Sequence, residues 1–357
     1  MFVWSKDSIK NEYTSLGFDH IPHTKGIDRT LHIKRSQKNR AVGEKIPPPY
    51  PNGWYELVES RDLKIGGVAS IDALGQNFCI YRGEDGVARV VDAYCPHLGA
   101  SFGSGGAVRG NCIECPFHLW RFGENGECTY IPDTKTIPKV TLKTWHSTEL
   151  DGAVWVWGRN EFIVGTHIRD IPENAADASH LHTVHGLNAL TNLGKEFPFL
   201  NDIIGFHYWT TSWTKTDDWH IAKLTIDQKF LLMKMNLFPL SGIVEQIGPA
   251  HVRLSFDTLF GPFFIVQSIT PLGPMLQKII HRVYSPTWNA VLISPMALIE
   301  AKQFDRDVKI WNNKKHIHSP PYVRADKAIR GFRDWYSQFY SEHSVTMRDA
   351  LTPKYDW

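Results

Sequence analysis

The sequence predicts an α+β protein in which an N-terminal all-β domain is followed by a larger α+β domain with an antiparallel sheet and helices. Three observations support this prediction. The chain has 357 residues, the length of about two ordinary domains, and 42% of them are hydrophobic against 21% charged, enough apolar material for sizeable cores. Short strand-like runs fill the first half. Helix-like and strand-like segments mix in the second half.

The all-β prediction rests on short runs with strand character. The runs at 78–81 and 87–91 are separated by Gly-Glu-Asp-Gly, and an Asp-Gly turn between two such runs is a strong hairpin signal. An aromatic run at 153–157 is predicted to close this domain. We therefore expect an N-terminal extension over residues 1–52, the all-β domain over 53–160 and the α+β domain over 161–357.

The second domain is predicted from mixed periodicity. Helix-like patterns occur around 173–188, 297–313 and 324–342, and strand-like patterns occur around 205–214, 221–236 and 250–269. The uncharged segment 258–277 has the length of a membrane-spanning helix. Its glycines and prolines favour buried strands with turns instead.

The net charge and the N-terminal segment argue against a nucleic-acid-binding protein and against a secreted one. Thirty-nine Lys and Arg against 37 Asp and Glu give a formal net charge of +2, so no strong overall field attracts nucleic acid. The first 20 residues contain no apolar core long enough for a signal peptide, so we expect a location on the cytoplasmic side. Contact with a membrane surface, such as that of the endoplasmic reticulum, stays open.

The cysteines point to a local metal site. All five lie between residues 79 and 128, and the chain also has 17 histidines. This distribution argues against a secreted disulfide scaffold. Cys95-Pro-His97 and Cys115-Pro-Phe-His118 each offer one thiolate and one imidazole on a tight loop. A [2Fe–2S] cluster of the Rieske type takes two Cys on one iron and two His on the other, so these four residues are its predicted ligands.

Zinc is the alternative for this site, because Cys112 and Cys115 have zinc-finger spacing and His97 and His118 could complete the set. That arrangement leaves Cys95 without a role, so the cluster is favoured. The remaining cysteines are then predicted to be small buried hydrophobes: Cys79, Cys112 and Cys128.

A second metal site is predicted in the back half. His180 and His185 lie five residues apart near several carboxylates, which suits a mononuclear iron held by two His and one carboxylate. On an ideal helix this spacing separates two side chains by about 140°, so we expect the helix to bulge or break near His182. The alternative is an amphipathic helix whose histidines bind no metal.

Three segments of the chain resemble Rieske non-haem iron oxygenases: CPHLGASFGSGGAVRGNCIECPFHLWRF, ENAADASHLHTVHG and DVKIWNNK. The sequence of these segments is most similar to that of the Neverland group, the cholesterol 7-desaturases, and the resemblance runs from about residue 54 to 335. It implies that the front domain is a Rieske domain and that the catalytic domain has a helix-grip, lipid-transfer-like fold. It also implies a homotrimer.

The resemblance assigns roles to residues of the back half. His180 and His185 would bind the mononuclear iron, and Asp177 would bridge an iron-ligand histidine to His118 of a neighbouring subunit. The third ligand would be Asp307, from the motif Asp-x-x-Ile-Trp-x-x-Lys, with Asp305 as the fallback. The same motif implies that two aromatic side chains wall the substrate pocket: Phe304 and Trp311.

The implied activity is desaturation of cholesterol to 7-dehydrocholesterol with O2 and with electrons from NAD(P)H. A separate ferredoxin or flavin reductase would deliver them, since the chain has no Gly-x-Gly-x-x-Gly opening of a dinucleotide-binding domain. Members of the group usually begin with a hydrophobic anchor, which this sequence does not show. Three alternatives stay open: a steroid hydroxylase of the ketosteroid 9α-hydroxylase type, a Rieske electron-transfer protein and a sterol-binding module.

Overall fold

The computed structural model describes residues 10–11, 32–33, 46–134, 136–149, 156–186, 197, 199, 203, 205–286, 288–317 and 320–352. The chain divides into two compact units. The small unit is Glu56–Val154, and the large unit combines Met1–Tyr55 with Trp155–Trp357. The segment before residue 56 therefore belongs to the same unit as the C-terminal part of the chain.

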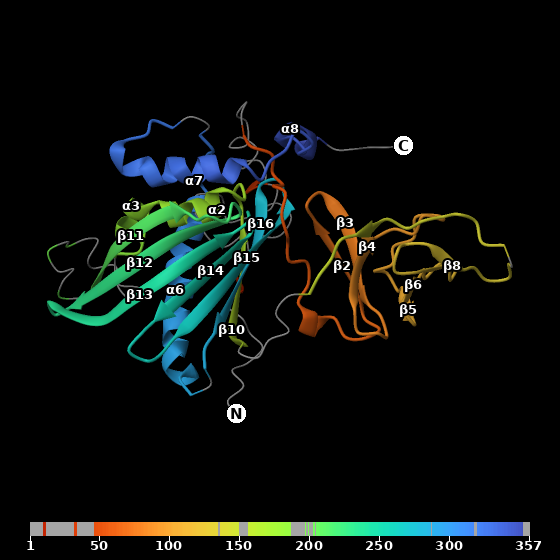
Figure 1. The fold of residues 1–357 in the computed structure, drawn as a ribbon, viewed down its shortest axis with the longest axis horizontal. Coiled ribbons are helices and arrows are strands. Elements are labelled where there is room, and N and C mark those ends of the chain that lie inside the picture. Colours follow the sequence, from red (N-terminus) through yellow and green to blue (C-terminus); the bar gives the residue numbers. More distant parts are fainter. Residues whose placement is uncertain are drawn as a thin grey trace. The chain divides into compact units, whose positions relative to one another are not determined.

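The small unit consists of two antiparallel four-stranded sheets and one 3-10 turn, η1 (Ser60–Asp62). The first sheet has the order β2-β3-β4-β9, with β2 (Val68–Ala73), β3 (Gln76–Arg82), β4 (Ala88–Asp92) and β9 (Thr144–Trp145). The second has the order β5-β6-β7-β8, with β5 (Ala107–Arg109), β6 (Cys112–Glu114), β7 (Arg121–Phe122) and β8 (Cys128–Tyr130) (Figure 1). The all-β prediction is confirmed.

The predicted hairpin is the β3–β4 connection. Its turn is closed by the Gly83 N–H, which donates to the Val87 carbonyl at 3.1 Å, and Gly86 adopts a φ of 80°, which favours glycine. The last five residues of β3 are buried, with Cys79 and Tyr81 in one core cluster and Phe78 and Ile80 in another. Cys79 is fully buried, as predicted for a small hydrophobe.

An eight-stranded sheet forms the large unit, in the order β1-β10-β16-β15-β14-β13-β12-β11. Neighbouring strands are antiparallel except for β1 and β10, which are parallel. The strands are β1 (Lys10–Asn11), β10 (Val156–Val164), β11 (Phe206–Lys215), β12 (Ile221–Leu232), β13 (Met235–Ile247), β14 (His251–Asp257), β15 (Phe263–Gly273) and β16 (Leu276–Tyr284).

Strand β10 pairs with β16 of this sheet, so the sequence-based boundary at residue 160 falls inside a strand of the large unit. Residues 153–155 lie outside the described part of the chain. The uncharged segment 258–277 contributes β15 and the start of β16. Over the described residues, no helix has the length and apolar character needed to cross a membrane.

In Figure 1 a long helix crosses one face of the sheet, and the other helices lie along the upper edge of the sheet in this view. The helices are α2 (Asp170–Glu173), η2 (Asn174–Ala176), α3 (Ala178–Val184), α6 (Ala290–Trp311), η4 (Arg324–Asp326), α7 (Lys327–Ser337) and α8 (Met347–Leu351). The predicted helix over 173–188 is instead a series of three short pieces. The predicted helix over 297–313 lies almost wholly within α6, which begins seven residues earlier.

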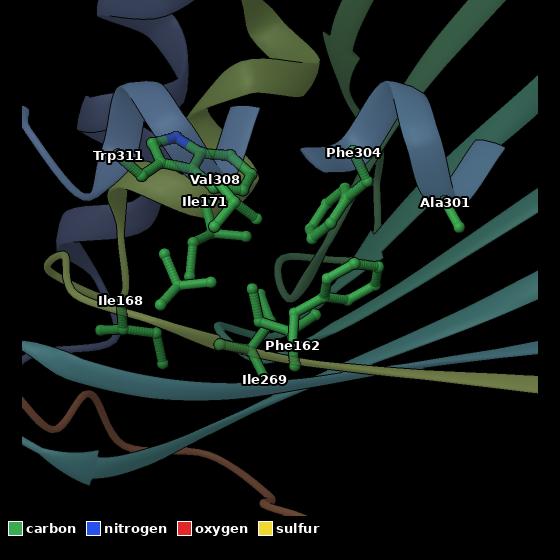
Figure 2. Close-up of a cluster of buried hydrophobic side chains, with 10 residues drawn as sticks. Phe162, Ile168, Ile171, Ile269, Ala301, Phe304, Val308 and Trp311 are labelled. Carbon is green, nitrogen blue, oxygen red and sulfur yellow. The ribbon is translucent and has the colours of Figure 1, made fainter. Parts of the chain in front are cut away.

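The core that positions α6 is drawn in Figure 2. Ala301, Phe304, Val308 and Trp311 recur at helical spacing and face the sheet. There they meet Phe162 and other apolar side chains: Val164, Ile168, Ile171, Ile269 and Ile279. Burying three aromatic and several aliphatic side chains in this way contributes about 1.5–3 kcal/mol each, so the register of α6 against the sheet is strongly determined.

Candidate metal centres

Two loops of the small unit carry the predicted cluster ligands, and they share one hydrogen-bond pattern. In each loop the cysteine N–H, of Cys95 or Cys115, donates to the carbonyl five residues later. The cysteine carbonyl accepts from the N–H four residues later, and the four distances lie between 2.8 and 3.1 Å. Gly99 and Leu119 occupy the same position in their loops, with φ of 74° and 59°. The two loops are therefore copies of one backbone conformation.

The side chains on these loops separate into a sulfur side and an imidazole side. Cys95 and Cys115 are buried at 2% and 1% exposure and lie in the core cluster. His97 and His118 are half-buried, with ring centroids 4.9 Å apart, and His97 stacks on Trp120 at 4.2 Å. Two sulfurs inside and two imidazoles toward the surface are the donor set of a Rieske cluster.

Two observations bear on whether the donors fit a two-iron cluster. His97 Nδ1 is buried and has no hydrogen-bond partner among the described residues, so it is free to bind a metal. Burial raises the pKa of the Cys95 thiol to about 11, and the adjacent Cys115 sulfur adds to the rise. A bound cation would counter both causes of the raised pKa, burial and the neighbouring sulfur, because metal ligation deprotonates a thiol.

The zinc alternative requires four donors that converge on one point. Within the described ranges, one group of three or more metal-binding side chains has its donor atoms within 4.8 Å of one another, and it lies in the large unit. Cys112 lies on β6, half-buried, with its sulfur 3.5 Å from Thr129 Oγ1. Cys112 and Cys128 are half-buried and not fully buried as expected, although Cys128 packs against the core cluster of the small unit.

The second candidate centre begins with a capped helix. Asp177 leaves helical conformation, with φ −99° and ψ 88°, and its Oδ1 accepts from the N–H groups of Ser179 and His180 at 3.0 and 3.1 Å. An aspartate at this position satisfies N–H groups that have no partner in the helix itself. This cap is why the predicted single helix is divided before α3, and sequence reasoning missed it.

The five-residue spacing of the histidines is accommodated by the end of α3. The helix ends at Val184, and His185 departs from it with φ −104° and ψ 0°. The side chain of His185 can therefore approach that of His180, and their ring centroids are 5.3 Å apart. The expected distortion near His182 is thus the helix end, two residues later at Val184, and the His182 side chain is exposed.

His180, His185 and Asp307 form the group with donor atoms within 4.8 Å of one another. His185 Nε2 lies 3.0 Å from Asp307 Oδ2, and Asp307 Oδ1 is buried without a hydrogen-bond partner among the described residues. Two ligands at right angles around a metal with bonds of about 2.1 Å are about 3.0 Å apart. Of the two aspartates suggested by the sequence, Asp307 joins this group and Asp305 does not.

Hydrogen bonds set the protonation of both imidazoles. Arg306 Nη1 donates to Gln303 Oε1 at 2.8 Å, and the same oxygen lies 3.3 Å from His185 Nδ1. Because a guanidinium only donates, the shared atom is the amide oxygen, and Nδ1 must carry the hydrogen. With the neutral ring, His185 Nε2 presents a lone pair toward Asp307 Oδ2 at 3.0 Å, and a cation bound between the two atoms would satisfy both.

His180 is prepared in the same way. Its Nδ1 faces the main-chain carbonyl of Asp177, to which it donates, so its Nε2 is also left with a lone pair. Burial lowers the pKa of His180 and favours the neutral ring that binds metals. The group therefore fits a divalent metal with two nitrogens and one carboxylate, an arrangement that leaves coordination positions open.

Gln303 and Arg306 were not identified from the sequence. For Gln303 the signal was present in the spacing, because a residue four before Asp307 on a helix lies on the same face. For Arg306, which directly precedes Asp307, the spacing gave no such signal. Phe304 and Trp311, predicted to wall the pocket, are 8% and 2% exposed and pack in the core at 5.3 Å between ring centroids. Their contact with a substrate stays a prediction.

An ion-pair network ties this site to the C-terminal part of the unit. Glu173 on α2 accepts from Arg333 Nε and Nη2 at 2.6 and 2.9 Å, and Lys314 Nζ lies 3.4 Å away. Lys314 also pairs with Asp170 at 3.3 Å. A buried bidentate pair of this kind fixes geometry, so the start of the segment that carries Asp177 is anchored to α7.

Comparisons with known proteins agree on both units. Residues 53–145 match the family model of the Rieske [2Fe-2S] domain, and residues 130–340 match that of the 3-ketosteroid 9alpha-hydroxylase C-terminal domain. The cholesterol 7-desaturase of Bombyx mori is 51% identical over 98% of this chain and 82% of its own length. A probable 3-ketosteroid-9-alpha-monooxygenase oxygenase component of Rhodococcus rhodochrous is 27% identical over 84% of this chain and 83% of its own.

Among solved structures, an oxygenase and ferredoxin complex of carbazole 1,9a-dioxygenase is similar. Its matched chain superposes with a TM-score of 0.57 and 15% sequence identity, over 90% of this chain and 98% of that chain. At this identity the likeness concerns the fold. It supports the description of a Rieske domain joined to a catalytic domain built on an antiparallel sheet.

Proposed function

Because this chain belongs to the cholesterol 7-desaturase family of Rieske oxygenases, we propose that it is itself a cholesterol 7-desaturase. The reaction takes cholesterol, O2, two electrons and two protons to 7-dehydrocholesterol and two molecules of water. NAD(P)H supplies the electrons through a separate ferredoxin or flavin reductase. The observation that carries the proposal is the convergence of His180, His185 and Asp307 in a chain that also has a Rieske domain.

In this proposal Cys95 and Cys115 hold one iron of the cluster and His97 and His118 hold the other. When bound, the cluster passes single electrons, and the mononuclear iron activates dioxygen for removal of hydrogen from an unactivated carbon. The protein buries the two sulfurs and leaves the two imidazoles near the surface. His97 and His118 would therefore form the edge of a bound cluster that a partner protein can reach.

His180, His185 and Asp307 hold the mononuclear Fe(II). The Asp177 carbonyl and Gln303 keep hydrogens on the two Nδ1 atoms, so both Nε2 lone pairs stay directed at the metal. Phe304 and Trp311, on the same helix as Asp307, would wall the substrate pocket.

The proposed assembly is a homotrimer in which Asp177 links an iron-ligand histidine to His118 of the neighbouring subunit. Asp177 is half-buried, and its Oδ1 is engaged in capping α3, which leaves Oδ2 for such a link. The substrate is a membrane lipid, which supports a location on the cytoplasmic side at the surface of the endoplasmic reticulum.

The experiment is incubation of the purified protein with cholesterol, O2, NADH and a ferredoxin with its reductase, followed by mass spectrometry. We expect a product two mass units lighter than cholesterol and about three iron atoms per chain. A product sixteen units heavier would mean a hydroxylase. Two irons per chain and no product would mean an electron carrier, and binding without consumption would mean a sterol-binding module.

A matched pair of variants tests the mononuclear site. His180→Ala should abolish turnover and leave the absorption spectrum of the cluster unchanged, because the cluster ligands lie in the small unit. His182→Ala on the same helix is the control, since its side chain is exposed and it should keep full activity. Turnover by His180→Ala at the wild-type rate would contradict the assignment.

A further inference from the structure

A buried polar cluster lies in the large unit among His281 on β16, Gln267 on β15 and Glu300 on α6. His281 and Gln267 are paired directly across the two strands, and His281 Nε2 lies 2.9 Å from Gln267 Oε1. On the other side of the ring, His281 Nδ1 lies 2.9 Å from Glu300 Oε1. The imidazole is thus held between an amide and a carboxylate.

The surroundings of this cluster are apolar. The ring centroid of His281 lies 4.4 Å from that of Phe304 and 5.4 Å from that of Phe162, and both phenylalanines belong to the core under α6 (Figure 2). His281 is 2% exposed and Gln267 8% exposed. The Glu300 side chain retains 26% exposure, so the cluster is approached from the side of α6.

The hydrogen bonding of the cluster is incomplete. Glu300 Oε2 is buried and has no hydrogen-bond partner among the described residues, and the short contact between His281 Nδ1 and Glu300 Oε1 is not aligned as a hydrogen bond. A buried acceptor without a donor costs about 1–3 kcal/mol, and more when it is charged. Glu300 Oε2 can therefore accept a hydrogen bond from a donor outside the described residues.

Glu300, whose Oε2 lacks a hydrogen-bond donor, lies on the same helix as Asp307 of the metal group. Glu300 precedes Asp307 by seven residues of α6, which is nearly two helical turns, so the two side chains leave the same face about 10 Å apart along the axis. Phe304 lies between them on that face and touches both His281 and Trp311. A flat apolar molecule lying along this face against Phe304 would have one part at the metal group and one end at Glu300.

We propose that Glu300 accepts a hydrogen bond from the hydroxyl group of the substrate sterol, with His281 and Gln267 as positioning residues that hold the carboxylate in place. The inference rests on the proposed function and names the group by which that site recognises its substrate. The hydroxyl is the single polar group of cholesterol, and it supplies the hydrogen that Glu300 Oε2 lacks. A 3-ketone has no hydrogen to donate, so the carboxylate disfavours it.

The test compares cholesterol with its 3-keto analogue as substrates of the holoenzyme. We expect wild-type protein to prefer the hydroxyl sterol by at least tenfold in kcat/KM, because a site with a buried acceptor rejects a ligand that cannot donate. Glu300→Gln replaces one carboxylate oxygen by an amide that donates. It should lower that preference at least tenfold, mainly through the KM for cholesterol, with the cluster spectrum and the iron content unchanged. Glu342→Gln, at an exposed residue, is the control.

Failure of this inference is distinguishable from failure of the proposed function. If wild-type protein converts neither sterol, the proposed function fails and this inference with it. If wild-type protein desaturates cholesterol and Glu300→Gln keeps the wild-type preference, the inference alone is overturned. If Glu300→Gln does not fold, the same ratio is measured in His281→Gln, which removes the positioning ring. An unchanged ratio there overturns the proposal, and a reduced one supports it.

Discussion

Replacing Gln303 by leucine tests how the protein prepares its mononuclear site. Gln303 Oε1 is 3.3 Å from His185 Nδ1 and 2.8 Å from Arg306 Nη1. Leucine has a similar volume but no acceptor, so His185 loses the partner that keeps the hydrogen on Nδ1. Either nitrogen can then carry that hydrogen, and the ring presents its lone pair to the metal for only part of the time.

The expected magnitude follows from that one hydrogen bond. A neutral hydrogen bond is worth about 1 kcal/mol net, and loss of a partner to a metal-bound histidine weakens metal binding by about 10–100-fold. Because the contact with His185 is long at 3.3 Å, we expect the lower end, about tenfold or about 1.4 kcal/mol. Gln303→Glu keeps an acceptor at the same place and should retain most of the wild-type affinity.

The assay removes the mononuclear iron by mild chelation and titrates Fe(II) back while turnover is followed. The absorption spectrum of the cluster reports that the small unit is intact. Lys302→Leu, at the exposed neighbour on α6, is the matched control. Fe(II) affinity of Gln303→Leu within twofold of the wild-type value would refute the reasoning.

Two further predictions concern stability. Gly126 and Gly86 both have φ 80°, but an added Cβ would lie 1.9 Å from the Leu142 carbonyl oxygen at Gly126 and meets nothing within 4 Å at Gly86. Gly86→Ala should therefore cost about 1 kcal/mol, and Gly126→Ala several times more, in denaturant unfolding of the whole chain. His167 is fully buried, and burial lowers its pKa to about 4 from 6.5. The unfolded chain binds this proton first, so the stability contributed by the neutral ring is complete above pH 6.5 and is lost as the pH falls toward 4, by on the order of 3 kcal/mol.

Each of these predictions has a contrary outcome. Equal losses in the two glycine variants would mean that backbone conformation, and not the carbonyl of Leu142, decides the cost. For the histidine, unfolding free energies are compared between pH 7 and pH 5 in wild-type protein and in His167→Gln. A pH slope that is the same in both proteins would show that His167 is not its source. The ring has both nitrogens engaged, with Arg169 N–H and the Pro48 carbonyl, as only the neutral form allows.

Much of the candidate site was readable from the chain because its donors are close in sequence. Cys95 with His97, Cys115 with His118, and His180 with His185 are each separated by a few residues, so their spacing alone indicates that they share a loop or a helix end. The same holds for the hairpin at Gly83–Gly86, where turn chemistry is local. Asp307 was reached through a motif and not through spacing, and Asp305 remained an alternative until the fold was known.

The choice between those aspartates depended on tertiary structure. Asp305 and Asp307 differ by two residues, or about 200° around α6, so only the packing of Phe304, Val308 and Trp311 against the sheet decides which carboxylate faces the histidines. The bounds of α3 also depended on tertiary structure. Asp177 caps its start, His185 leaves the helical conformation at its end, and contacts with other elements decide both. A local pattern carries no information about such contacts.

The sequence by itself indicated the two candidate donor sets, apart from the choice of carboxylate in the second, together with the all-β and α+β halves and the family. Only the tertiary structure decided which carboxylate completes the second set, how Gln303 and Arg306 fix the tautomer of His185, and that Glu300 stands beside His281 with an unsatisfied oxygen. The physical reason is the same in each case. Ligand types and turns are properties of neighbouring residues, whereas protonation, hydrogen-bond satisfaction and the rotation of a helix are set by side chains that meet only in the fold. His185 lies 118 and 122 positions from Gln303 and Asp307, and His281 and Glu300 come from a strand and a helix.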